Sequence, residues 1–247
     1  MRSFLFPLLG MFLILGTAVA QDDPKAIIEK AIKAHGGQEK LTKLKATVMK
    51  AKGTMSFGGM EAEFTMASSS QLPDRFRNEM KIERTGQTLA FTEVFDGKKG
   101  WVSSMGKLTE VTGKGLTEMK EQAFGEYAES LLPLLTDKQF KLVTADAKEI
   151  ENHESIGVKV TAKGRKDRTM YFDKKTGMLL MVRKKATNPA GMEVDSESYL
   201  LDYKSVNGTK QPMKVLVKYG DEKFLEAAVT EIKLLESLDD KVFAKPE

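Results

Sequence analysis

Apolar and polar residues along this chain follow two periods, one helical and one alternating. The pattern predicts a capped helix over residues 24–34. Asp23-Pro24 precedes or begins it, alanine and isoleucine recur on one side, and Gly36-Gly37 follows its end. Residues 38–44 predict a second short helical turn, and residues 116–135 predict a longer helix that ends near Pro133.

The rest of the chain alternates between apolar and charged residues, which is typical of strands with one buried face. Turn signals such as Asp96-Gly97, Asn207-Gly208 and Gly220-Asp221 separate about eleven such segments. A twisted sheet of this many strands must curl. We therefore predict a mainly β fold with some α, in which a single antiparallel sheet curls into an incomplete half-barrel and the helices form a lid. Phe243, near the end of the chain, is expected to pack onto the body.

The first twenty residues have the pattern of a secretory signal peptide. Arg2 precedes an apolar run, and Ala18-Val19-Ala20 supplies small residues for cleavage. This predicts a signal at residues 1–20 and one domain over residues 21–247. The chain contains no cysteine, so the mature protein is expected to lack disulfides and an N-terminal lipid anchor, and to be soluble in the periplasm.

Recognisable enzyme and cofactor motifs are scarce in the sequence. Its two histidines, His35 and His153, have no zinc-binding spacing and are expected to be structural or solvated. No Gly-x-Ser-x-Gly elbow is present, and no carboxylate pair stands out in an apolar setting. We therefore expect neither an enzyme nor a cofactor, although carboxylates from distant strands leave an exported hydrolase as an open alternative.

Charge gives little evidence for a polyanionic partner. The formal net charge is +4, and basic residues cluster around Arg165, Arg168 and Lys184. They could bind an anionic head group if paired strands bring them together, but a solvated sheet face is the interpretation we favour. Without interleaved aromatic residues, nucleic-acid binding is not expected.

Methionine is the residue type that stands out, with fourteen in the chain. Several occupy the apolar side of the alternating segments, and flexible, polarizable methionine suits surfaces that accept variable apolar ligands. A filled core would use methionine too, so this pattern alone leaves both interpretations open. If the sheet is hollow, the candidate lining residues are Met55, Phe64, Met66, Met80, Phe91, Trp101, Phe124 and Leu131.

A series of short motifs resembles exported proteins of the LolA family of outer-membrane lipoprotein-sorting carriers. They are His35-Gly36-Gly37 with Leu41 and Leu44, Gly53-Thr54, Phe95-Asp96-Gly97 with Gly100-Trp101, Phe172-Asp173 with Thr176-Gly177-Met178, and Asp202-Tyr203 with Val206-Asn207-Gly208 and Pro212. The resemblance covers most of residues 21–247. It implies an incomplete β-barrel with a helical lid around an apolar cavity, and ligands such as lipids or lipoprotein acyl chains.

Together these observations predict a non-enzymatic periplasmic carrier or binding protein for a lipid or acylated lipoprotein. It would be a monomer, and donor or acceptor proteins at membrane surfaces are its other expected partners. The alternative is a periplasmic protein-interaction or sensor module that uses the same half-barrel without transporting lipid.

Overall fold

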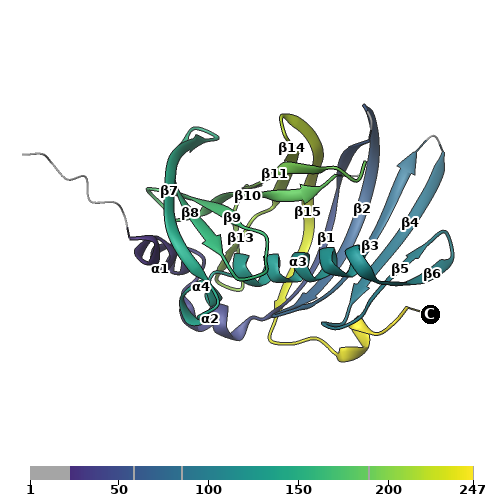
Figure 1. Cartoon of the computed structure of the whole chain (residues 1–247), viewed down its shortest axis with the longest axis horizontal. Coiled ribbons are helices and arrows are strands. Elements are labelled where there is room, and N and C mark those ends of the chain that lie inside the picture. Colours follow the sequence, from purple (N-terminus) through teal and green to yellow (C-terminus); the bar gives the residue numbers. More distant parts are fainter. Residues whose placement is uncertain (1–22, 58, 85, 189, 247) are drawn as a thin grey trace, which may run out of the picture.

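The computed structural model describes residues 23–246 except 58, 85 and 189, so the predicted signal peptide lies outside the described residues. Within this part, one antiparallel sheet of thirteen strands curves around helix α3 (Figure 1). Its order is β6-β5-β4-β3-β2-β1-β15-β14-β11-β10-β9-β8-β7, and a separate hairpin pairs β12 with β13.

The strands of the first half are β1 (Ala46–Phe57), β2 (Met60–Gln71), β3 (Arg75–Arg84), β4 (Gln87–Phe95), β5 (Gly100–Ser104) and β6 (Lys107–Val111). Those of the second half are β7 (Lys141–Ile150), β8 (His153–Thr161), β9 (Arg168–Asp173), β10 (Leu179–Thr187), β11 (Glu193–Leu201), β12 (Lys204–Val206), β13 (Thr209–Gln211), β14 (Lys214–Tyr219) and β15 (Glu222–Leu235).

The helices are α1 (Pro24–Ala34), α2 (Gln38–Lys43), α3 (Gly113–Glu129), α4 (Pro133–Thr136) and the short 3-10 helix η1 (Asp240–Phe243). The prediction for α1 is confirmed: Asp23 caps it by accepting a hydrogen bond from the backbone of Lys25. None of the helices in the described ranges has the length and apolar character that a bilayer crossing requires.

The number of strands and the end of the long helix differ from the sequence prediction. The main sheet has thirteen strands rather than about eleven, partly because the charged edge strand β6 carries too few apolar residues to show an alternation. The long helix ends at Glu129, and Leu131 then adopts a φ of 72°. Pro133 consequently begins α4 instead of ending α3, which agrees with the preference of proline for a first helical turn.

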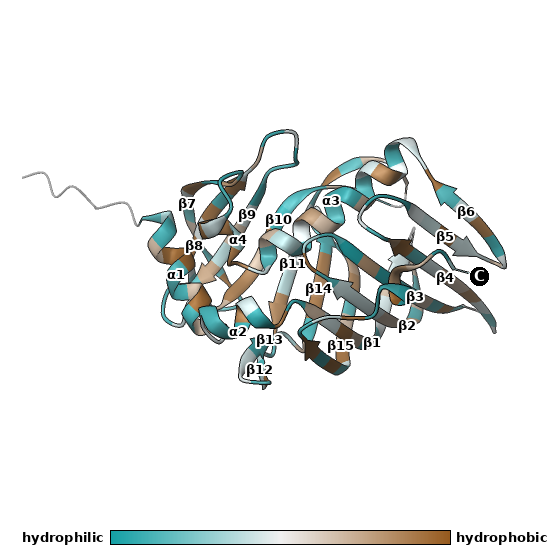
Figure 2. Ribbon diagram, turned by 90° about the horizontal axis from the view of Figure 1, so that it is seen from below, coloured by the Kyte–Doolittle hydropathy of each residue, from teal (hydrophilic) through white to brown (hydrophobic). Residues whose placement is uncertain are grey.

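Cross-strand register identifies the inner face of the sheet, because directly opposite residues share a face. One continuous row runs through Val158, Met170, Val182, Ser198, Val217, Leu225, Met55 and Ala62. Helices α1, α3 and α4 contribute to the core that covers this face on the second half of the sheet. Figure 2 shows the sheet as a trough with α3 on its inner side. The predicted half-barrel with a helical cover is therefore confirmed.

Gly53 allows the two central strands to approach closely. A Cβ at this position would overlap the backbone carbonyl of Glu226 on β15. The residue opposite Gly53 on β2 is Phe64, which is only 2% exposed. Glycine here removes the side chain at the point where β1 and β15 pack backbone against backbone, and so supports the curvature of the trough.

The C-terminal segment packs onto the outer face of β3, as the sequence predicted for Phe243. Phe243 is 1% exposed and lies 5.0 Å from the guanidinium carbon of Arg75. Arg75 also forms an ion pair with Asp240 in η1. Residues 240–243 therefore cover part of the outer face of β3.

Candidate ligand-binding site

The inner face of β1 to β4 carries a continuous apolar surface. Its buried members are Ala51, Met55, Ala62, Phe64, Ile82 and Ala227, and its partly exposed members are Met66, Met80, Leu89, Phe91, Phe224 and Leu225. Strand alternation places all the β1–β4 members on one side, since Met66 is opposite Met80 and Met80 is opposite Phe91. We call this set the apolar surface.

The structure brings together five of the eight residues predicted to line a cavity. Met55, Phe64, Met66, Met80 and Phe91 all belong to the apolar surface. Of these, Met55 and Phe64 are buried, whereas the other three side chains remain partly exposed. These three are the ones that a ligand could reach without displacing a buried side chain.

The other three predicted residues have separate locations. Leu131 lines a pocket beneath α3. Phe124 is buried on α3, where it stacks on Phe140 at 5.3 Å. Trp101 is opposite Val94, so it faces away from the row that contains Phe95 and Gly100 and lies on the outer side of the sheet. The alternation of side chains could be predicted from the sequence, but which alternating set faces the inside of the sheet could not.

A pocket of about 380 Å³ lies between the end of α3 and the inner face of the sheet. Its walls include Met49 on β1, Ser68 and Ser70 on β2, and Ile232 on β15, and we call it the helix pocket. Met49 and Ser68 form the row beyond Ala51 and Met66, so its wall continues the apolar surface. The volume falls within the range of about 300–1,000 Å³ that is usual for small-molecule sites.

Glu126 is an acidic residue that sequence reasoning missed. It lies on α3 and faces the helix pocket, where protein surrounds its carboxyl group. This burial raises the pKa of Glu126 to about 7, while a hydrogen bond from Gln122 acts in the opposite direction. Its spacing could have indicated that it is buried. Glu126 follows Met119 by seven residues and Ala123 by three, and this spacing places it on the buried side of the helix.

Arg168 corrects the expectation of a solvated basic face. It is 3% exposed, lies on β9 beneath α3, and donates a hydrogen bond from Nη1 to Glu129 at 3.2 Å. Gly125 on α3 makes room for it, since a Cβ there would lie 2.7 Å from Nη1 of Arg168. Arg183 and Lys185, in contrast, pair with Asp195 on the outer face, as a solvated sheet would predict.

Some of the sequence motifs that resembled LolA proteins attach helix α1 to the rest of the molecule. Asp173 accepts hydrogen bonds from the backbone and the hydroxyl group of Thr176, and the next residue, Gly177, lies against Lys30 of α1. His35 contacts Tyr203 edge to face at 5.6 Å, and burial lowers the pKa of this histidine. These residues serve the structure, and two of them, His35 and Tyr203, also line the helix pocket.

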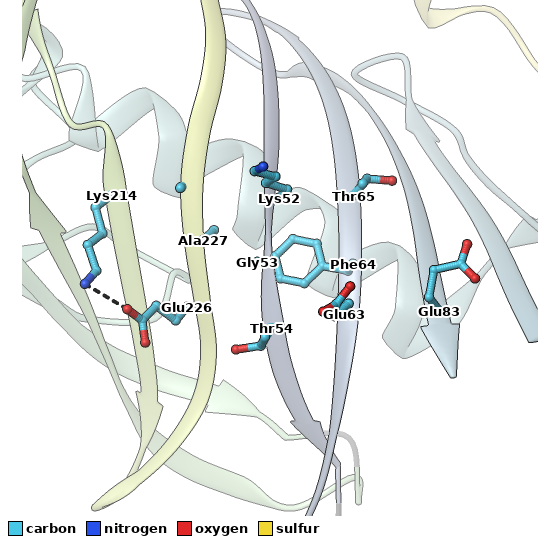
Figure 3. Close-up of a pocket in the computed structure, with 11 residues that line it drawn as sticks. Lys52, Gly53, Thr54, Glu63, Phe64, Thr65, Glu83, Lys214, Glu226 and Ala227 are labelled. Carbon is cyan, nitrogen blue, oxygen red and sulfur yellow. Dashed lines mark ion pairs between the residues drawn. The ribbon is translucent and has the colours of Figure 1, made fainter. Parts of the chain in front are cut away.

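A larger hollow, of about 590 Å³, is lined mostly by side chains from the outer side of the same strands, although Phe64 and Ala227 also contribute to it. Figure 3 shows Lys52, Thr54 and Glu63 around it, together with the ion pair between Lys214 and Glu226 at 2.8 Å. Its charged lining suits water and ions better than alkyl chains. We therefore place the candidate site on the inner face.

Three solved structures share this fold over nearly the whole chain. A DUF1329 family protein from Desulfovibrio piger has a TM-score of 0.58 at 13% identity, with 90% of this chain and 98% of that protein covered. A LolA superfamily protein from Nitrosomonas europaea has a TM-score of 0.55 at 14% identity, covering 90% and 97%. An outer membrane lipoprotein-sorting protein domain from Vibrio parahaemolyticus has a TM-score of 0.58 at 11% identity, covering 90% and 98%.

The fold and the inner pocket define a half-barrel protein with a helix across its concave face. Its structural neighbours are LolA superfamily, lipoprotein-sorting and DUF1329 proteins, so the resemblance predicted from sequence is confirmed for the fold. No family model matches the sequence, and no curated protein matches it either. At 11–14% identity, function has to be argued from the site itself.

Proposed function

We propose that this protein is a non-enzymatic carrier or binding protein, exported to the periplasm, that holds the acyl chains of a lipid or lipoprotein on its inner face. The observation that supports this most is the apolar surface, whose members Met66, Met80 and Phe91 stay partly exposed on the inner face of the sheet. A protein that only needed a core would bury them. The lipoprotein-sorting description of a structural neighbour points in the same direction.

The energetics favour a ligand with more than one anchor. Each CH₂ group that leaves water contributes about 0.8 kcal/mol, so a buried stretch of about ten contributes about 8 kcal/mol. Association costs about 4–15 kcal/mol in lost translational and rotational freedom. One acyl chain alone therefore binds weakly, and useful affinity needs either a second chain or a polar contact at the head group.

A charge placed on the apolar surface should weaken ligand binding. In Phe91→Glu, a carboxylate would meet the alkyl chain, and we expect the Kd of a neutral fluorescent apolar probe to rise by about tenfold or more. The matched control is Ala90→Glu, which adds the same charge to the outer, exposed side of β4. Fluorescence titration measures both variants, and equal Kd values for them would contradict the proposed location.

Native mass spectrometry of protein purified from the periplasm tests the function directly. We expect bound lipid that organic solvent extracts and that competes with the apolar probe. Protein that carries no lipid and does not bind the probe would contradict the carrier function. Recovery of one stable protein partner without lipid would favour the interaction or sensor module instead.

A further inference from the structure

Two cationic residues lie directly opposite each other inside the trough. Arg168 on β9 pairs in register with Lys184 on β10, and both belong to the inner face. Like charges at directly opposite positions destabilise a sheet, and burying a cation is costly unless an anion compensates it. This arrangement therefore calls for negative charge nearby.

Only one of these two cations pairs directly with a carboxylate of the described residues. Arg168 reaches Glu129 through Nη1, but its buried Nε has no hydrogen-bond partner among the described residues. Lys184 is half-buried and forms no ion pair with any described residue. The Lys184 ammonium group thus remains available to a ligand, while the enclosed Nε of Arg168 leaves a buried cation only partly compensated.

A cavity of about 280 Å³ adjoins both residues, and we call it the cation cavity. Two of the acidic residues in its wall are already neutralised: Glu118 pairs with Lys166 at 3.1 Å, and Glu121 pairs with Arg165 at 3.0 Å. A third, Glu93, has its pKa raised by burial, which favours its uncharged form.

The cation cavity lies next to the apolar surface. Glu93, in its wall, follows Phe91 on the same face of β4 and is opposite Asn78. The row of Asn78 and Glu93 is thus the neighbour of the row of Met80 and Phe91. A molecule whose chain lies on Met80 and Phe91 would have its polar end within reach of the cavity.

We propose that the cation cavity binds the anionic head group of an acylated amphiphile, a phosphate, sulfonate or carboxylate, through the ammonium group of Lys184, next to the buried charge of Arg168. This assignment rests on the proposed function and specifies its ligand class. The head group supplies the polar contact that a single acyl chain needs for useful affinity. Charge-assisted hydrogen bonds of this kind are the stronger ones in proteins.

The charges around the site predict the direction of its pH dependence. The charged groups that line it on the inner face are Glu118 and Glu121 from α3, Glu93 from β4, Arg168 from β9, Lys184 from β10, and Lys166. Lys185 points to the outer face, where it pairs with Asp195, and two further α3 carboxylates act on the site through its cations: Glu129 pairs with Arg168, and Glu126 interacts with Lys184. Lys184 interacts electrostatically with Glu126, whose pKa burial raises to about 7. As the pH falls through this value, Glu126 loses its negative charge, so the anion should bind more tightly.

The test uses three ligands with the same hexadecyl chain and different head groups: hexadecane sulfonate, hexadecanol and hexadecyltrimethylammonium. Each displaces the apolar probe from the purified, delipidated protein. We expect the sulfonate to bind at least about tenfold more tightly than the alcohol, and Lys184→Gln to remove this difference. The control is Arg183→Gln, which deletes the same charge one residue earlier on the outer face and should leave the preference unchanged.

The sulfonate stays ionised across the relevant range, so its pH profile reports on the protein. Its affinity should be higher at about pH 6 than at about pH 8, and Glu126→Gln should abolish this difference. Affinity that rises with pH would overturn the assignment.

The remaining outcomes separate this inference from the proposed function. Equal binding of sulfonate and alcohol, or a preference for the ammonium ligand, would overturn the anion site and leave the carrier function standing. Failure of all three ligands to displace the probe would refute both. Inorganic sulfate or phosphate that binds as tightly as the hexadecyl sulfonate would indicate a free-anion site and overturn the amphiphile assignment.

Discussion

Replacing Gly53 with alanine should lower the free energy of unfolding by about 3 kcal/mol, at the upper end of what overpacking normally costs. The new methyl group would overlap backbone atoms of Glu226 and Ala227, and a backbone cannot move aside as a flexible side chain can. β1 and β15 would have to separate at the centre of the sheet. Urea unfolding followed by circular dichroism measures the change.

The control for this prediction is the neighbouring exposed residue Lys52. Lys52→Ala should stay within about 0.5 kcal/mol of the parent protein, as surface substitutions usually do. If Gly53→Ala were equally mild, the close approach of β1 and β15 would not be a constraint on the trough.

Substituting Glu126 with glutamine should stabilise the protein at alkaline pH. The folded-state pKa of Glu126, about 7, lies above the ordinary value of 4.5, so the native state binds more protons than the unfolded state between these values. The free energy of unfolding therefore falls as the pH rises through this window. Glu126→Gln removes the effect, and at about pH 8 the variant should be more stable by on the order of 2 kcal/mol.

Chemical denaturation at several pH values tests this prediction. At about pH 4, where Glu126 is mostly protonated in both states, the two proteins should differ little. Glu149→Gln controls for net charge because it deletes a glutamate from an exposed position on β7. A parent–variant difference that stayed constant across the whole pH range would show that Glu126 is not desolvated in the folded protein.

Much of the fold could be predicted because it depends on local patterns. Asp23-Pro24 and Gly36-Gly37 bound α1 through capping and backbone preferences that act within a few residues. Alternation placed Met66, Met80 and Phe91 on the same side of their strands, and the register confirms that they meet. The edge strand β6 escaped prediction because its pattern is mostly polar.

The candidate site could be predicted only for its apolar part. Phe64 and Met66 on β2 are separated from Phe91 on β4 by two consecutive hairpins, so local pairing brings them together. Trp101 has the same kind of pattern, yet it lies on the outer side, because a shift of one residue reverses the side to which a strand residue points. Burial of Arg168 depends on α3, which is distant in sequence and crosses above β9.

The sequence by itself determined the alternation of the strands, the positions of most turns and helix ends, and a supply of apolar residues sufficient to coat one face of a curled sheet. These features arise from interactions between near neighbours in the chain. Only the tertiary structure decided that Glu126, Arg168 and Lys184 share the interior with that apolar face. The desolvation and electrostatic coupling of such groups depend on their distances in space, which no local pattern of residues contains.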